Sequence, residues 1–206
     1  MSEKNDRQPE RQQELPDERH EEHEQQPELR PQIYVASLSD YNAGRLHGAW
    51  LDAAQTPEAL MAGISSMLAA SPIPGAEEWA IHDYEAFAGV QLGEYESIEN
   101  VSKIALGIAQ HGTAFGAWAE GLDHSDWQDL ERFDDCYQGR WESLTDYAED
   151  LLDALGIPQI IEKAVPETLQ AYVSIDAESF GRDMSYNGDV YVVDDDSAGG
   201  VFIFWS

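Results

Sequence analysis

The sequence predicts an α+β fold in which a helical segment separates two small α+β units, after a polar N-terminal tail. Strand-like runs bounded by turn formers occur near both ends of the apolar part of the chain, and only helical periodicity occurs between them. The amino-acid composition changes abruptly at residue 32, where aromatic and aliphatic residues become frequent. Four ranges follow: a tail at 1–31, an N-terminal α+β domain at 32–96, a helical middle domain at 97–130 and a C-terminal α+β domain at 131–206.

The tail is predicted to be disordered. It consists mainly of Glu, Gln, Arg and Pro, and after Met1 its only sizeable aliphatic residues are Leu15 and Leu29. So little apolar surface cannot offset the entropy lost on folding. The remaining residues, 32–206, contain Trp, Phe, Tyr, Leu, Ile and Val throughout, which is enough for one or two small hydrophobic cores.

The N-terminal domain begins with a predicted β-hairpin. Its two strand-like runs are QIYVASL and RLHGAWLDA, and the turn formers SDYNAG join them. Pro57 suits the first turn of a helix, which the residues 71–75 then end, since they include two prolines and a glycine. The apolar residues of this helix recur at helical spacing: Leu60, Met61, Ile64, Met67 and Leu68. The run EEWAIHDYE predicts a third strand.

The middle domain shows helical periodicity from Ser97 onward. Its first helix is expected to bury Ile98, Val101, Ala105 and Ile108. Two further helical segments run through Phe115, Trp118 and Leu122, and then through Trp127 and Leu130. These spacings predict three helical segments and no strand.

The C-terminal domain contains the clearest helix of the chain, within SLTDYAEDLLDALG. Ser143 is a good N-cap with Asp146 three residues later, and Gly156 with Pro158 predicts the end of the helix. A loose alternation over 133–141 predicts a strand before it, and Pro166 predicts the start of a short helix after it. The runs DVYVV and GGVFIFW then predict two strands around a DDDSAG turn.

The charge of the chain is its most unusual property. Eleven Lys and Arg face 41 Asp and Glu, so the formal net charge is −30. The tail contains ten acidic and five basic residues and so has a net charge of −5, which leaves a net charge of −25 for residues 32–206. Charge of this density destabilises the compact state by repulsion. Adaptation to a high-salt cytoplasm is one explanation, and a surface that imitates a polyanion is the other. Nucleic acids and membranes are themselves anionic, so proteins with basic surfaces are the expected partners, with no direct nucleic-acid binding.

The acidic residues form a row on the helix that follows Ser143. Glu142, Asp146, Glu149 and Asp153 follow helical spacing opposite the leucines, with Asp150 beside them. At 1.5 Å per residue the row places a carboxylate about every 5 Å, comparable with phosphates on a DNA strand. A solvated helix face is the simpler interpretation, but the pattern recurs. The other predicted DNA-imitating acids are Asp83, Glu85, Glu94, Glu96, Glu99, Glu120, Asp123, Asp126, Asp129, Glu131, Asp134 and Asp135. These acids form two clusters, one from Asp83 to Glu99 and one from Glu120 to Asp135, and both clusters lack a basic partner in the sequence until Arg132.

Catalytic and metal-binding functions are disfavoured. With 41 carboxylates a close pair is inevitable, so it carries no information about glycosidase chemistry. The histidines do not form HExxH, and DDDSAGG lacks the alternating ligands of a calcium loop. Cys136 alone cannot form an internal disulfide and is expected to be a packed thiol, while Gly112 and Gly116 are isolated glycines. We expect no catalytic residue, cofactor or metal, no membrane span, and a cytoplasmic location.

Several strings, in order and spacing, resemble the ArdA family of antirestriction proteins. They are IYVASLSDYNAGRLHGAWLDA, EEWAIHDYE, LGEYESI, YQGRWESLTDYAEDL and VPETLQAYVSIDAESFGRDM, and the resemblance covers residues 32–206. It implies an elongated, curved homodimer of three-domain subunits, joined through their C-terminal parts, that imitates bent DNA and inhibits type I restriction-modification enzymes. A dimer of the body would carry 50 excess negative charges, the phosphate complement of roughly 25 base pairs.

The family's antirestriction motif corresponds to one segment of the C-terminal domain. Its matching residues are Ala164, Val165, Pro166, Glu167, Leu169, Tyr172 and Asp176, whereas the preceding IIEKA fits the pattern less well. Val165, Leu169 and Tyr172 recur at helical spacing and predict an apolar ridge suited to a dimer interface or the core. The predicted function is therefore competitive occupation of the DNA groove of a type I enzyme. The alternative is an acidic surface of a high-salt-adapted protein with an unrelated binding function, and a carboxylate-pair hydrolase is a distant third.

Overall fold

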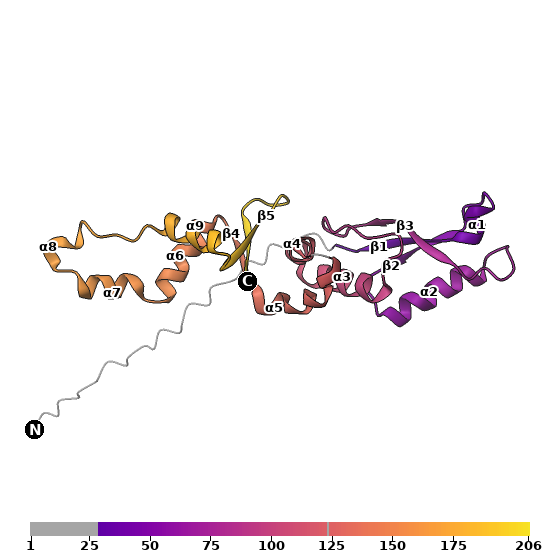
Figure 1. The fold of residues 1–206 in the computed structure, drawn as a ribbon, viewed down its shortest axis with the longest axis horizontal. Coiled ribbons are helices and arrows are strands. Elements are labelled where there is room, and N and C mark those ends of the chain that lie inside the picture. Colours follow the sequence, from indigo (N-terminus) through magenta and orange to yellow (C-terminus); the bar gives the residue numbers. More distant parts are fainter. Residues whose placement is uncertain (1–28, 123) are drawn as a thin grey trace, which may run out of the picture.

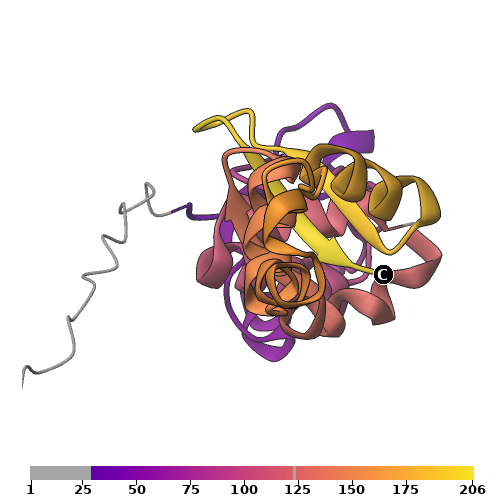
Figure 2. The same cartoon turned by 90° about the vertical axis from the view of Figure 1, so that its left-hand side faces the viewer.

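Two three-stranded antiparallel sheets lie at different positions along an elongated molecule, with helices between and beyond them (Figure 1). The computed structural model describes residues 29–122 and 124–206. Figure 2 looks at the end formed by the helices of residues 157–170 and shows the elements overlapping within a narrow cross-section. The mixture of helices and small antiparallel sheets confirms the predicted α+β class.

The N-terminal sheet has β1 (Gln32–Ser37) at its centre, between β2 (Gly48–Asp52) and β3 (Trp79–Glu85). β1 pairs antiparallel with both neighbours. Helix α2 (Pro57–Ala69) packs against β1 and β2 through Leu60, Ile64 and Met67, which are buried. Thr56 caps this helix by accepting a hydrogen bond from the backbone of Ala59, and Pro57 occupies its first turn, as the sequence predicts.

The predicted turn of the first hairpin contains a short helix instead. α1 spans Leu38–Asn42, and Ser37 caps it by accepting from the backbone N–H of Asp40 at 3.3 Å. The segment was expected to be a turn because Ser, Asp, Asn and Gly favour turns, but the same side chains also cap helices. The chain then returns to β2 through Gly44, which has a φ of 74° that suits glycine.

The middle of the molecule is helical, as predicted. It contains α3 (Ile98–His111), α4 (Thr113–Gly121), the 3₁₀ helix η1 (His124–Arg132) and α5 (Phe133–Cys136). The third predicted helical segment is a 3₁₀ helix. One prediction requires correction: residues 133–136 form a helical turn where a strand was expected. Phe133 and Cys136 are both buried, and this spacing of three residues fits a helical turn.

The C-terminal sheet has the order β4-β6-β5, with β4 (Tyr137–Trp141), β5 (Val190–Asp194) and β6 (Val201–Trp205). Four helices lie between β4 and β5: α6 (Leu144–Ala154), α7 (Ile157–Ala164), α8 (Glu167–Gln170) and α9 (Ala177–Asn187). The sequence predicts α6, α8 and both late strands. It does not predict α7 and α9.

The two unexpected helices have identifiable causes. Gly156, with a φ of 69° in the left-handed region, ends α6, and α7 begins at the next residue with Pro158 in its first turn. The Gly156 and Pro158 pair therefore marks both an end and a new start. Helix α9 is capped by Asp176, whose carboxylate accepts from the backbone and hydroxyl of Ser179 at 2.9 and 2.7 Å.

One hydrophobic cluster runs from the N-terminal sheet to the C-terminal sheet. It includes Ile33 of β1, Ile104 of α3 and Phe204 of β6, and Trp118 of α4 stacks near Phe204 with ring centroids 5.3 Å apart. A smaller cluster of Tyr147, Met184, Val190 and Ile203 lies beneath α6 and α9. Because the larger cluster crosses both predicted domain boundaries, at residues 96 and 130, the division into three domains stays a prediction.

Candidate functional site

The acidic row of α6 is exposed along its length. Ser143 caps the helix, as predicted, by accepting from the backbone N–H of Asp146 at 3.2 Å. The buried face of the helix consists of Tyr147, Ala148 and Leu152. The exposed face contains the predicted carboxylates of Asp146, Glu149, Asp150 and Asp153. Glu142 is also exposed, but it lies just before the N-cap Ser143 rather than on the helix. The alternation of buried and exposed positions therefore leaves an uninterrupted acidic face on this helix.

Helix α9 and β4 hold α6 in place. A Cβ atom on Gly181 of α9 would lie 3.1 Å from the carbonyl oxygen of Leu144 and 3.2 Å from the Cβ of Ala148, so the absence of a side chain allows the two helices to approach closely. Tyr147 packs edge-on against Trp141 of β4, with ring centroids 5.4 Å apart. These contacts fix the apolar face inward and the carboxylates outward.

A second group of predicted carboxylates lies around β3 and the segment before α3. Asp83, Glu85, Glu94 and Glu99 are exposed and Glu96 is half-buried. The backbone N–H of Ile81 donates to the Glu94 carbonyl at 2.9 Å and so holds this segment beside the edge of β3. The Glu96 carboxylate accepts from the backbone of Ser97 and from the Asn100 side chain, each at 3.0 Å.

A third group lies at η1 and α5, and it is less purely acidic than the sequence suggests. Lys103 of α3 donates to Glu131 at 2.6 Å, and this hydrogen bond lowers the pKa of the Glu131 carboxyl. His111 Nε2 lies 3.6 Å from the Asp134 carboxylate. The expectation that this cluster lacks a basic partner before Arg132 is therefore wrong, because a residue 28 positions earlier folds against it. Glu120, Asp134 and Asp135 are exposed and Asp129 is half-buried, while Asp123 and the side chain of Asp126 lie outside the described residues.

The three groups occupy successive positions along the molecule rather than one cleft. β3 lies in the N-terminal half, α5 near the middle and α6 in the C-terminal half (Figure 1). Two exposed acids just before β3, Glu77 and Glu78, extend the first group and were not among the predicted residues. Their position between a proline-rich loop and a strand is the signal that would have found them. The arrangement suits contact with an extended partner.

Two other carboxylates are buried and belong to the scaffold. Asp40 accepts a hydrogen bond from the Ser71 hydroxyl, and this bond holds the pKa of the Asp40 carboxyl below its ordinary value against the opposing effect of burial. The bond ties α1 to the segment after α2. Burial of Asp195 would raise its pKa, but hydrogen bonds from Ser197, Arg140 and the Ala198 backbone together lower it.

Arg140 organises the loop between β5 and β6. Its Nε donates to the Asp195 carboxylate at 2.8 Å, and its terminal nitrogen donates to the carbonyls of Ala198 and Gly199. Asp195 also accepts from Ser197. The DDDSAGG segment is thus a turn closed by an ion pair, as the sequence analysis favoured over a calcium loop.

The end of the molecule formed by α7 and α8 exposes apolar side chains. Neither helix has a buried residue. The large exposed apolar residues here are Leu155, Ile160, Leu169, Tyr172 and Val173, of which Tyr172 is 84% exposed. We call these five residues the apolar end. An apolar group of this kind on a highly charged protein marks an interaction surface.

The predicted antirestriction motif lies at this end, but not as one helix. Val165 is extended before α8, and Tyr172 follows that helix in a turn. The helical ridge expected from Val165, Leu169 and Tyr172 is therefore wrong, because Pro166 interrupts the backbone hydrogen bonds at this point. Ala164, Pro166 and Glu167 are exposed, whereas the Asp176 carboxylate caps α9 and its pKa is lowered by the backbone and side chain of Ser179.

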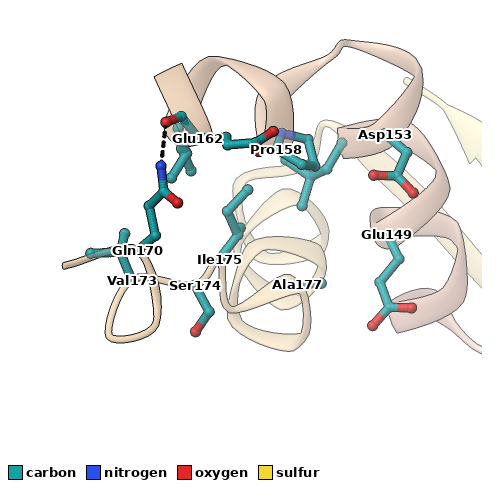
Figure 3. Close-up of a pocket in the computed structure, with 11 residues that line it drawn as sticks. Glu149, Asp153, Pro158, Glu162, Gln170, Val173, Ser174, Ile175 and Ala177 are labelled. Carbon is teal, nitrogen blue, oxygen red and sulfur yellow. Dashed lines mark hydrogen bonds between the residues drawn. The ribbon is translucent and has the colours of Figure 1, made fainter. Parts of the chain in front are cut away.

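A cavity of about 460 Å³ lies where α6, α7 and the residues before α9 meet (Figure 3). Its apolar lining includes Leu152, Pro158 and Ile175, and Glu149 and Asp153 of the α6 row contribute to its wall. Gln170 closes one side by donating to the Glu162 carbonyl at 2.9 Å. The acidic row and the apolar end therefore share a border.

Among residues 29–122 and 124–206, no three His, Cys, Asp or Glu side chains form a group able to hold a metal ion. The same part of the chain contains no helix with the length and apolar character needed to cross a bilayer. Cys136 is a buried free thiol.

Comparison with known proteins gives one family. A family model described as antirestriction protein (ArdA) matches residues 33–198, which is most of the chain. No curated protein sequence matches the chain. The match spans the N-terminal sheet from Ile33, the helical middle, the α6 row and the apolar end, and it ends after β5 and before β6.

Proposed function

This chain belongs to the ArdA family of antirestriction proteins, and we propose that it inhibits type I restriction-modification enzymes by occupying their DNA-binding groove in place of DNA. The observation that carries the proposal is the exposed acidic row of α6 within a chain of this family. Asp146, Glu149 and Asp153 recur about every 5 Å along the helix, a spacing comparable with that of DNA phosphates, with Asp150 beside them and Glu142 just before the N-cap. No catalytic residue is required, because inhibition is by occupation.

The distribution of charge supports the proposal. The three acidic groups follow one another along an elongated molecule, as phosphates follow a duplex (Figure 1). Residues 32–206 have only six Lys and Arg, and within the described part of this range Lys103, Arg140 and Arg182 form ion pairs with Glu131, Asp195 and Asp183. Most of the negative charge is therefore not neutralised within the chain and can interact with a basic groove. Attraction between the acidic protein and the basic groove should make association fast and sensitive to salt.

We propose further that the protein acts as a homodimer joined through the apolar end. Helices α7 and α8 lie at one extremity of the molecule (Figure 1), so pairing through the apolar end would place two acidic arrays in line. Burial of exposed Tyr172 and its neighbours supplies the apolar area that association between two anionic chains requires. The dimer would match the charge of roughly 25 base pairs.

Competition with DNA tests the proposed inhibition. Purified protein is added to a type I enzyme bound to fluorescent DNA at low ionic strength, with an unrelated acidic protein of similar net charge as control. We expect this protein to release the DNA and the control to leave it bound. Equal release by both proteins would favour the high-salt alternative, and no release would refute groove occupation.

The dimer is tested by Tyr172→Asp, with Tyr186→Asp as the matched control. Both tyrosines are more than 80% exposed, at 84% and 82%, but Tyr186 lies on α9 outside the apolar end. We expect light scattering to give a monomer for Tyr172→Asp and a dimer for the control. A Tyr172→Asp protein that stays dimeric would place the interface elsewhere.

A further inference from the structure

We propose that a recess beside the N-terminal sheet, with Tyr95 as its anchor, receives arginine side chains of a basic protein partner. The inference rests on the proposed function and assigns to this region a recognition mode other than phosphate imitation. The recess measures about 610 Å³ and lies where α1, α2 and the start of β3 meet the segment before α3. In Figure 1, α1 and α2 lie at the opposite end of the molecule from α7 and α8.

The floor and one wall of the recess are aromatic or apolar. Tyr95 is 71% exposed and Met61 is 41% exposed, so the recess offers apolar and aromatic surface to a partner. Trp79 is half-buried and packs against the main core, and Leu38 and Ile98 complete the apolar lining. A phosphate-like surface needs none of these side chains, so they indicate a contact that charge alone does not provide.

Four acidic residues also line the recess: Glu77, Glu78, Glu96 and Glu99. No Lys or Arg is among the described residues that line the recess. The recess therefore combines negative potential with exposed aromatic rings. That combination favours a cation that can also stack on a ring.

The backbone around the recess is held in place before any partner binds. The N–H of Leu38 donates to the Glu78 carbonyl at 3.0 Å, and the N–H of Ile81 donates to the Glu94 carbonyl at 2.9 Å. Ser97 caps α3 by accepting from the backbone of Asn100 at 3.2 Å. Tyr95 thus lies on a segment fixed on both sides, which lowers the entropy lost when the ring is immobilised.

Arginine fits this chemistry better than lysine. Its planar guanidinium stacks on aromatic rings and binds carboxylates through two parallel hydrogen bonds, whereas the lysine ammonium is a compact, strongly hydrated charge. A second copy of this chain is disfavoured at the recess, because the acidic residues that line it would repel another acidic surface, whereas the five residues of the apolar end are uncharged. A DNA-binding groove presents arginines at high density.

The test compares Tyr95→Ala, Tyr95→Phe and the control Tyr186→Ala in the DNA-displacement assay over a range of salt concentrations. Tyr95→Ala should weaken displacement by roughly 3-fold to 30-fold, the range of one cation–π contact. This weakening should leave the slope of log affinity against log salt unchanged, because no charge is lost. Tyr95→Phe and Tyr186→Ala should behave as wild type, while Glu77→Gln with Glu78→Gln should reduce the slope.

A second measurement keeps the inference independent of the enzyme. Titration with synthetic arginine and lysine peptides of equal length should give tighter binding of the arginine peptide, and Tyr95→Ala should remove that preference. If wild-type protein displaces DNA but Tyr95→Ala matches Tyr186→Ala, the recess assignment is overturned and groove occupation stands. If the wild-type protein displaces no DNA, groove occupation is refuted. The peptide titration alone then tests whether the recess binds arginine. Equal affinity for the two peptides overturns it.

Discussion

The acidic row of α6 should weaken the fold that presents it, and this can be measured with the variant Glu149→Gln, Asp150→Asn, Asp153→Asn. Asp146 is left unchanged because its carboxylate accepts from the Ser143 hydroxyl at the N-terminus of the helix. All three substituted residues are exposed, so the substitutions remove charge while leaving the buried face intact. The variant therefore isolates the electrostatic cost of the row.

The magnitude follows from the helix spacing. Among the five carboxylates, the triple variant removes the like-charged pairs 146–149, 146–150, 149–153 and 150–153. At about 0.2–0.5 kcal/mol per pair, the free energy of unfolding should rise by about 0.8–2 kcal/mol at low ionic strength. Removal of negative charge near the C-terminus of the helix, where the helix dipole disfavours it, adds to the gain. The gain should shrink as salt screens the remaining charges.

Urea denaturation in low and high salt measures the stability, and the DNA-displacement assay measures the function. We expect the variant to be more stable than wild type yet a weaker competitor. If each carboxylate replaces one phosphate, the slope of log affinity against log salt should fall by up to about 3. Loss of stability, or a stability gain that does not depend on salt, would refute the electrostatic reasoning. Unchanged displacement by a folded variant would remove α6 from the contact surface.

Four further substitutions test the scaffold that presents these surfaces. Arg140→Gln leaves the buried Asp195 carboxylate without its ion pair and should cost about 2–4 kcal/mol in urea denaturation. Because the folded pKa of Asp195 lies below its ordinary value of 3.8, its contribution to wild-type stability is present above about pH 4 and is lost at lower pH. Acid titration should therefore show a smaller loss of stability in Asp195→Asn than in wild type. Asp40→Asn should lower the melting temperature without altering the exposed acidic groups, and an unchanged melting temperature would contradict its assigned role. Gly116→Ala would place a Cβ atom 2.5 Å from the Cβ of Ala88 and should cost about 1–3 kcal/mol, whereas a neutral effect would show that the loop at Ala88 can move.

Most of the local structure follows from the sequence where one physical signal dominates. Pro57 and the apolar spacing after it predict α2, and Ser143 with the leucine face predicts α6 and its exposed carboxylates. The missed helices are those whose signals compete. Gly156 ends one helix and begins another, and a single residue cannot reveal both roles without the tertiary context.

The site was harder to predict where residues distant in sequence meet. The ion pair of Glu131 with Lys103 and the burial of Asp40 against Ser71 depend on how α3 and α2 pack, so a count of local charges could not reveal them. The recess at Tyr95 was missed for the same reason, since it joins residues from Leu38 to Glu99. The composition correctly predicts that the surface is negatively charged. Which carboxylates are buried in the scaffold and which are exposed depends on how the elements pack.

The distinction between groove occupation and salt adaptation lies in the coupling between stability and binding. Both explanations predict that salt stabilises the protein, because screening relieves repulsion in either case. Only groove occupation predicts that a basic partner also relieves the repulsion among the carboxylates. The same charges that destabilise the free chain should then strengthen its complex with the enzyme. The stable but weakly competing α6 variant is the signature of that coupling. A salt-adapted surface would gain stability on neutralisation and lose no affinity for a DNA-binding enzyme, because its carboxylates contact only water and ions.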